Sequence, residues 1–181
     1  MRLFVLCAVT AFTLTSCAAP RVVPQPPAAP PVKTTNTPPP RMISKPATVQ
    51  PTGHWTDWPI EAGVWSYAKD DRGSIARFGA VGKDAVVMLR CDKARARLYL
   101  SRAANAGGSM TVRTSSTSKA VAMQPTGAPS PYVASELIVS DPLLDAMAFS
   151  RGRIALELPG AQNIAIPIWS EIGRVTEDCR S

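Results

Sequence analysis

The chain has 181 residues, of which 18 are proline, and its formal net charge at pH 7 is +7. The proline share is about twice the average of globular proteins, so part of the chain is not expected to join a folded core. Residues 1–53 hold five Lys or Arg and no Asp or Glu, whereas residues 54–181 hold fifteen and thirteen, and this near balance in the larger part argues against nucleic acid as a partner.

The amino-terminal residues 1–16 have the pattern of a cleaved signal peptide. Met1 and Arg2 are followed by an apolar run of twelve residues, Leu3–Leu14. A helix that spans a bilayer needs roughly 20 apolar residues, so this run is too short to be a stable anchor by itself.

The sequence LTSC at residues 14–17 resembles the lipobox of bacterial lipoproteins. The resemblance implies that the Cys17 thiol receives a diacylglyceryl group, that cleavage makes Cys17 the first residue, and that its amine is then acylated, for example with palmitate. Several acyl chains hold a protein stably on a bilayer. Ala18 resembles the residue at this position in outer-membrane lipoproteins, which implies a location there, facing the periplasm. The alternative is an ordinary signal peptide with Cys17 incidental or a free thiol.

Residues 17–53 are predicted to be a disordered, proline-rich tether. Eleven prolines lie between Pro20 and Pro51, together with four basic residues and no acidic residue. Such a segment buries too little apolar surface to offset the entropy of ordering. Extended as polyproline II it would reach on the order of 110 Å, so the folded part could act well away from the membrane.

Residues 54–181 are predicted to form one mainly β domain. Short apolar stretches recur along it, from GVWSYAK at residues 63–69 to NIAIPI at residues 163–168. Residues 85–91 are apolar on both faces, which is typical of a central strand. The connecting sequences DDRG, GKD, NAGGS and PTGAPSP have turn composition. The pattern favours an antiparallel, β-sandwich-like fold with α+β character at its margins.

A basic face is expected on the stretch RARLYLS at residues 95–101. Arg95, Arg97 and Tyr99 alternate with apolar residues, and Arg102 follows directly. With Arg90 and Lys93 just before them, these residues form the densest basic patch of the chain. One interpretation is a surface that binds an anionic envelope polymer such as peptidoglycan or lipopolysaccharide. The alternative is a solvated strand face whose charges protect an edge from aggregation.

A short helix is expected near residues 142–150. Asp141 is a suitable N-cap, Pro142 suits the first helical position, and Gly152 follows as a stop.

A carboxy-terminal helix is expected near residues 169–179, because Ile172, Val175 and Cys179 fall on one helical face. The other cysteine of the domain, Cys91, points inward from the predicted central strand. In an oxidising compartment, two buried cysteines favour a Cys91–Cys179 disulfide, which would contribute roughly 4.5 kcal/mol by loop closure. The alternative is a pair of buried free thiols.

The sequences DAMAFSRGRIALELPG and IPIWSEIGRVTEDCR, together with the inward Cys91, resemble small secreted or lipid-anchored envelope proteins of alphaproteobacteria that have no assigned activity. There is also a distant similarity to periplasmic domains of the invasion-associated locus B type. The resemblance implies a β-sandwich with a disulfide and no site residues.

No catalytic, metal or cofactor residue is predicted. His54 is the only histidine, which leaves neither a zinc ligand set nor a Ser-His-Asp arrangement, and the chain lacks GxSxG and glycine-rich phosphate-loop sequences. Trp55, Trp58 and Trp65 either form an exposed aromatic binding surface or close one end of the sandwich.

These observations favour a non-enzymatic envelope lipoprotein whose domain has a binding or structural role, with peptidoglycan, lipopolysaccharide or another envelope protein as its partner. The alternative is an enzyme that acts on envelope polymers such as peptidoglycan. A hollow that joins two acidic residues with raised pKa values would favour the enzyme, and a basic or aromatic face would favour the binding protein.

Overall fold

The structure of the protein is a computed structural model that describes residues 50–181. The predicted signal peptide, the predicted lipidation site Cys17 and most of the predicted tether lie outside the described residues.

The described residues form nine strands, two α-helices and two short 3₁₀ turns, which confirms a mainly antiparallel β fold with helices at its margins. The strands are β1 (Val64–Asp70), β2 (Gly73–Gly79), β3 (Val87–Asp92), β4 (Arg97–Ala103), β5 (Gly108–Arg113), β6 (Ser118–Pro125), β7 (Tyr132–Ile138), β8 (Arg153–Glu157) and β9 (Ile164–Pro167). The helices are α1 (Pro142–Ala148) and α2 (Ser170–Arg180), and the 3₁₀ turns are η1 (Trp55–Asp57) and η2 (Lys93–Arg95).

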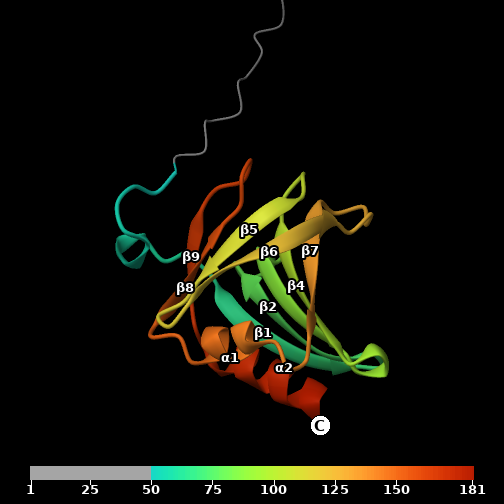
Figure 1. Cartoon of the computed structure of the whole chain (residues 1–181). Coiled ribbons are helices and arrows are strands. Elements are labelled where there is room, and N and C mark those ends of the chain that lie inside the picture. Colours follow the sequence, from blue (N-terminus) through green and yellow to red (C-terminus); the bar gives the residue numbers. More distant parts are fainter. Residues whose placement is uncertain (1–49) are drawn as a thin grey trace, which may run out of the picture. The chain divides into compact units, whose positions relative to one another are not determined.

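The strands form a single sheet in the order β1-β2-β3-β4-β7-β6-β5-β8-β9. Strand β6 belongs to both halves of this sheet, because it pairs with β5 along most of its length and with β7 only at Gln124 and Pro125. The sheet then folds over on itself (Figure 1), so that Nε1 of Trp65 on β1 donates a hydrogen bond of 2.8 Å to the backbone oxygen of Pro167 on β9. Both halves therefore enclose one core.

Strand alternation determines which side chains enter that core. On β4, Leu98 and Leu100 are fully buried, while Arg97 and Tyr99, which alternate with them, are only half-buried. This is the period of two that the sequence predicts for a strand with one buried face. Apolar side chains from both halves of the sheet and from both helices meet in the same cluster.

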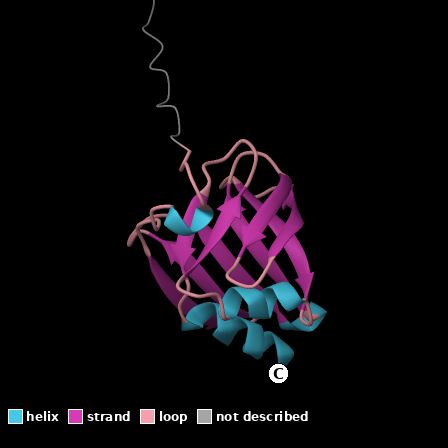
Figure 2. Cartoon of the chain, turned by 60° about the vertical axis from the view of Figure 1, so that its left-hand side comes forward, coloured by secondary structure: helices cyan, strands magenta, loops and turns pink. Residues whose placement is uncertain are grey.

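The two helices lie at the same end of the sheet (Figures 1 and 2). Helix α1 begins as predicted, because Oδ1 of Asp141 accepts a hydrogen bond of 2.9 Å from the backbone N of Leu143, and Pro142 occupies the first position. It ends at Ala148, before the predicted Ser150. Helix α2 buries Ile172, Val175, Thr176 and Cys179 against β2, β3 and α1. Neither helix of residues 50–181 has the length and apolarity needed to cross a bilayer.

The folded part begins before the predicted boundary at His54. The side-chain amide of Gln50 donates to the backbone oxygen of Ala161 and accepts from the backbone N of Asn163, each at 2.8 Å. These contacts place Gln50 in the domain, although the sequence assigns it to the tether.

The tryptophans near this boundary pack against the domain and are not exposed on its surface. Trp58 and Trp65 are each 6% exposed, and Trp58 packs on small residues of β8 and β9, Ala155 and Ala165. Trp55 is half-buried and packs against the same cluster. The three rings therefore pack against the domain, and the interpretation as an exposed aromatic surface is wrong.

Candidate functional site

The candidate site is a groove on the face of β2, β3, β4 and β7 that points away from the core. The strand register places Arg77, Met88, Ser101 and Ala134 in one row across this face. Directly opposite residues in such a row lie about 4.5–5.5 Å apart at Cβ. Because Ser101 and Ala134 are small and their neighbours are long, the row leaves a hollow.

The groove has a volume of about 500 Å³. Its floor contains the apolar side chains of Ile75, Met88 and Ala134, with hydroxyls of Ser101 and Thr126 beside them. Around the floor stand Tyr99 and four arginines, Arg72, Arg77, Arg90 and Arg95. The lining includes no acidic residue, so the groove is a basic surface over an apolar floor.

Two of the four arginines are neutralised by carboxylates just outside the groove. Arg90 binds Asp70 through both terminal nitrogens, at 3.0 and 2.7 Å, and Arg72 binds Asp92 at 2.8 Å. The hydrogen bonds from Arg90 lower the pKa of Asp70 to about 2. The hydrogen bond from Arg72 likewise lowers the pKa of Asp92. Both ion pairs hold their arginines in place at the rim.

The other two arginines, Arg77 and Arg95, are not in ion pairs within the described part of the chain and can bind an anionic ligand. Among residues 50–181, no carboxylate oxygen lies within 4.0 Å of the guanidinium of Arg77 or Arg95. Nη1 of Arg95 donates to the hydroxyl of Tyr99 at 3.5 Å, and this contact raises the pKa of Arg95. The Tyr99 hydroxyl in turn donates to Glu136 at 3.0 Å. Tyr99 is therefore oriented by contacts on both sides.

Only part of the predicted basic face lines the groove. Arg95 and Tyr99 line the groove, but Arg95 lies in the turn η2 rather than on a strand, because Ala96 has a left-handed backbone with φ of 49°. Arg97 is on the same outer face, outside the groove lining, and its Nε donates to Glu136 at 3.0 Å. Arg97 is thus occupied by a surface ion pair.

Arg102 is not part of any outer face, and its assignment to the binding face is wrong. It lies two and four residues after the buried Leu100 and Leu98, so strand alternation turns it inward, and it is 3% exposed. Its Nη1 donates to the backbone oxygen of Leu156 at 2.9 Å, and Nη2 donates to that of Gln162. Burial lowers the pKa of Arg102 to about 10, against the partly compensating charge of Glu61.

Two groove arginines, Arg72 and Arg77, are absent from the predicted basic patch, which already includes Arg90. Arg77 interrupts the otherwise apolar stretch SIARFGAV, and Arg90 interrupts AVVMLRC. Each charge inside an apolar stretch is a signal that one face of the strand is in contact with water. The sequence does not reveal that Arg77 lies opposite Met88, which depends on the register.

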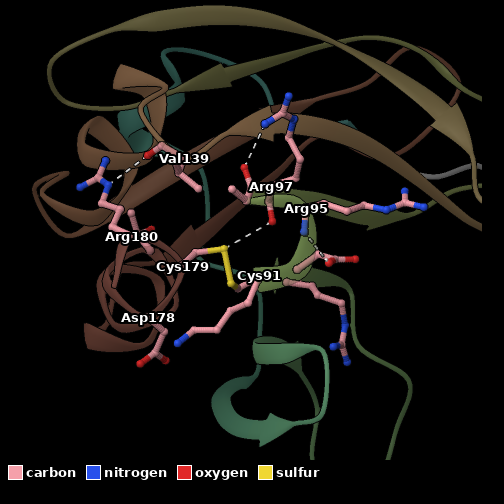
Figure 3. Close-up of a disulfide and its surroundings, with 12 residues drawn as sticks. Cys91, Arg95, Arg97, Val139, Asp178, Cys179 and Arg180 are labelled. Carbon is pink, nitrogen blue, oxygen red and sulfur yellow. Dashed lines mark hydrogen bonds between the residues drawn. A yellow bond between two sulfur atoms is a disulfide. The ribbon is translucent and has the colours of Figure 1, made fainter.

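The disulfide predicted between Cys91 and Cys179 is present, with Cα atoms 5.4 Å apart. Figure 3 shows how it links α2 to the end of β3, directly before η2. The residue after Cys91 is Asp92, whose carboxylate accepts from the backbone N of Arg95 at 3.3 Å and from Arg72 at 2.8 Å. The bridge therefore supports the segment that positions two arginines of the groove.

A second hollow of about 700 Å³ lies between the β5–β6 turn and helix α1. Phe149 stands beside it with 82% of its surface exposed. Its charged residues are largely paired, since Lys119 contacts Asp141 at 2.8 Å and Asp145 contacts Arg180 at 2.8 Å. We regard this hollow as a weaker candidate, because its lining includes two carboxylates and Arg151 is its only charged residue without an ion pair among residues 50–181.

Residues 50–181 contain no group of three or more His, Cys, Asp or Glu side chains arranged to hold a metal ion. Nδ1 of His54 lies 2.7 Å from the hydroxyl of Thr56.

No family model, curated protein or solved structure is significantly similar to this chain. The resemblances of the sequence to lipoproteins and to small envelope proteins therefore stay predictions, and the groove is the basis for a functional proposal.

Proposed function

We propose that this chain is a lipid-anchored protein of the bacterial cell envelope whose folded domain binds an anionic envelope polymer such as peptidoglycan or lipopolysaccharide. One observation carries the proposal: four arginines and no acidic residue line the groove, and two of the arginines, Arg77 and Arg95, have no carboxylate partner among residues 50–181. The sequence LTSC ending at Cys17 and the acid-free tether support the anchored location, on the outer membrane facing the periplasm.

The chemistry of the groove suits phosphate and carboxylate groups. A guanidinium presents a planar fork of donors that binds such groups through two parallel hydrogen bonds. Arg72 and Arg90 are held by Asp92 and Asp70, so they keep the rim in shape while Arg77 and Arg95 remain available. A tether that reaches on the order of 110 Å would bring this surface to a polymer distant from the bilayer.

The alternative, an enzyme on envelope polymers, has less support. Hydrolysis of glycans uses two carboxyl groups, one of them with a raised pKa. Asp141 and Asp145 line the second hollow, but Asp141 is paired with Lys119 and its pKa is lowered by that hydrogen bond and the one from Leu143, which outweigh the effect of burial. A carboxylate held in its charged form is a poor proton donor, so we favour the binding protein.

Sedimentation of the whole chain with purified peptidoglycan and with lipopolysaccharide tests the groove. Charge-assisted hydrogen bonds contribute about 1.5–3 kcal/mol each, so the double variant Arg77→Gln/Arg95→Gln should bind at least about tenfold more weakly. Arg151→Gln removes an exposed arginine of the second hollow and is the matched control. Equal binding by the double variant and the wild type would refute the groove as the site.

The anchor is tested separately by labelling cells with radioactive palmitate. The wild-type chain should carry the label and partition with membranes, and Cys17→Ala should lose both properties. An unmodified amino terminus on the mature native protein, seen by mass spectrometry, would refute the lipid anchor without affecting the groove.

A further inference from the structure

The floor of the groove is apolar, and a ligand that carries only anionic groups would make no use of it. Ile75 is 4% exposed and lies on the face opposite to the core residues Ala76 and Phe78. Met88 and Ala134 continue this floor onto β3 and β7. Polar side chains other than arginine are limited to the hydroxyls of Tyr99, Ser101 and Thr126. A sugar chain, which exposes many hydroxyls, would leave most of its hydrogen bonds unmade on such a floor.

We propose that the occupant of the groove is a phosphorylated lipid, with an acyl chain on Ile75, Met88 and Ala134 and the phosphate on Arg77 or Arg95. This inference rests on the proposed function and narrows it: of the two polymers named there, lipopolysaccharide carries both phosphates and acyl chains, whereas the glycan strands of peptidoglycan have no apolar tail. The cationic rim complements the phosphate, and the apolar floor complements the chain. The volume of about 500 Å³ lies within the range of small-molecule sites, roughly 300–1,000 Å³.

The placement of the groove argues against two other occupants. Strands β2, β3 and β4 lie between paired neighbours, and β7 is paired on both sides at Ala134, where it lines the groove, so a peptide has no free backbone edge within the groove to which it could add a strand. A symmetric contact between two copies of the chain would bring the same arginines face to face. That contact would cost free energy through repulsion between Arg77 and Arg95 of one copy and those of the other.

Met88 gives the floor its capacity to adapt to a chain. A methionine side chain is unbranched and polarizable, so it fills irregular space against flexible ligands. Each methylene that leaves water for such a surface raises affinity by about fourfold. The lipid is therefore expected to bind much more tightly than its head group alone.

Calorimetric titration of the 181-residue chain carrying Cys17→Ser, which has no acyl group of its own at that position, tests the inference. Three soluble probes are compared below their micelle concentrations: dihexanoyl phosphatidic acid, glycerol 3-phosphate and dihexanoylglycerol. We expect phosphatidic acid to bind at least about tenfold more tightly than either of the others, since only it uses both parts of the groove. Arg151→Gln should leave all three affinities unchanged.

Two variants separate the contribution of the phosphate head to the affinity from that of the acyl chains. Arg77→Gln/Arg95→Gln should weaken phosphatidic acid and glycerol 3-phosphate alike. Met88→Gln keeps the side-chain length and should reduce the affinity for phosphatidic acid to that for glycerol 3-phosphate, which itself should not change. Ala134→Gln, on the neighbouring half of the floor, should repeat this result if Met88→Gln fails to fold.

The outcomes distinguish this inference from the proposed function. If glycerol 3-phosphate binds as tightly as phosphatidic acid and the floor variants have no effect, the lipid is refuted while the anion groove stands. If no probe binds but peptidoglycan sedimentation depends on Arg77 and Arg95, the lipid is likewise refuted. If neither probes nor polymers depend on these arginines, both proposals fail.

Discussion

Arg102 on β4 donates a hydrogen bond of 2.9 Å to the backbone oxygen of Leu156 on β8, two strands that are not neighbours in the sheet. The bond crosses the interior and ties the two halves of the folded sheet together. Among residues 50–181, no carboxylate oxygen lies within 4.0 Å of this guanidinium. The backbone oxygens of Leu156 and Gln162 therefore accept the hydrogen bonds of its two terminal nitrogens.

Arg102→Ala is expected to lower the free energy of unfolding by about 2–4 kcal/mol, because it leaves the oxygens of Leu156 and Gln162 without their donor and opens a cavity. Urea unfolding followed by circular dichroism measures the loss. The control is Arg97→Ala, on the same strand but in an exposed ion pair with Glu136, where the loss should not exceed about 1 kcal/mol. Similar losses in both variants would contradict a structural role specific to Arg102.

Reduction of the Cys91–Cys179 bridge is expected to lower the free energy of unfolding by about 4–5 kcal/mol, since the cysteines are 88 residues apart and the bridge restricts the unfolded chain. Unfolding curves with and without dithiothreitol measure the difference. The double variant Cys91→Ala/Cys179→Ala should be insensitive to the reductant. A wild type that is equally insensitive would show that the bridge adds little stability.

Gly173→Ala should stabilise the protein by about 0.5–1 kcal/mol, because Ala costs less backbone entropy than Gly inside a helix. A Cβ at this position of α2 would meet the Cβ of Ala148 at 3.7 Å, an ordinary contact. Gly63→Ala is the counterpart, since its Cβ would lie 2.8 Å from the backbone carbon of Gly79, and it should destabilise by about 1–3 kcal/mol. Thermal unfolding of both variants checks the opposite signs.

The ion pair of Asp70 with Arg90 is expected to make stability depend on pH at the acid end. The pKa of Asp70 is about 2 in the folded protein against 3.8 for the free group. Because the folded pKa is the lower one, the contribution of the pair is present above pH 3.8 and is lost as the pH falls through 2.

Asp70→Asn removes this titration. Wild type and variant should therefore differ in unfolding free energy at pH 5 and converge as the solution is acidified toward pH 2, approximately the folded pKa. Chemical denaturation across this range measures the convergence. A constant difference would mean that the carboxylate of Asp70 is not stabilised by its partners.

Local patterns in the sequence were sufficient for the secondary structure and for the disulfide. The apolar stretch at residues 63–69 predicts a strand, and β1 spans Val64–Asp70. A strand's alternation and a helix's cap are both encoded within a few residues, so they can be read without knowing the rest of the fold. The same alternation, continued through β4, turns Arg102 inward, which contradicts its predicted place on the basic face.

The groove was decided only by the tertiary structure. Arg77, Met88, Ser101 and Ala134 come from four strands, and their meeting depends on the register between those strands. A shift of one residue in a single pair would send its side chains to the other face. That register follows from packing the whole core at once, which is a non-local condition that no short stretch of sequence contains. The sequence by itself determined the elements and their bridge, and the packing of the sheet turned scattered arginines into a surface.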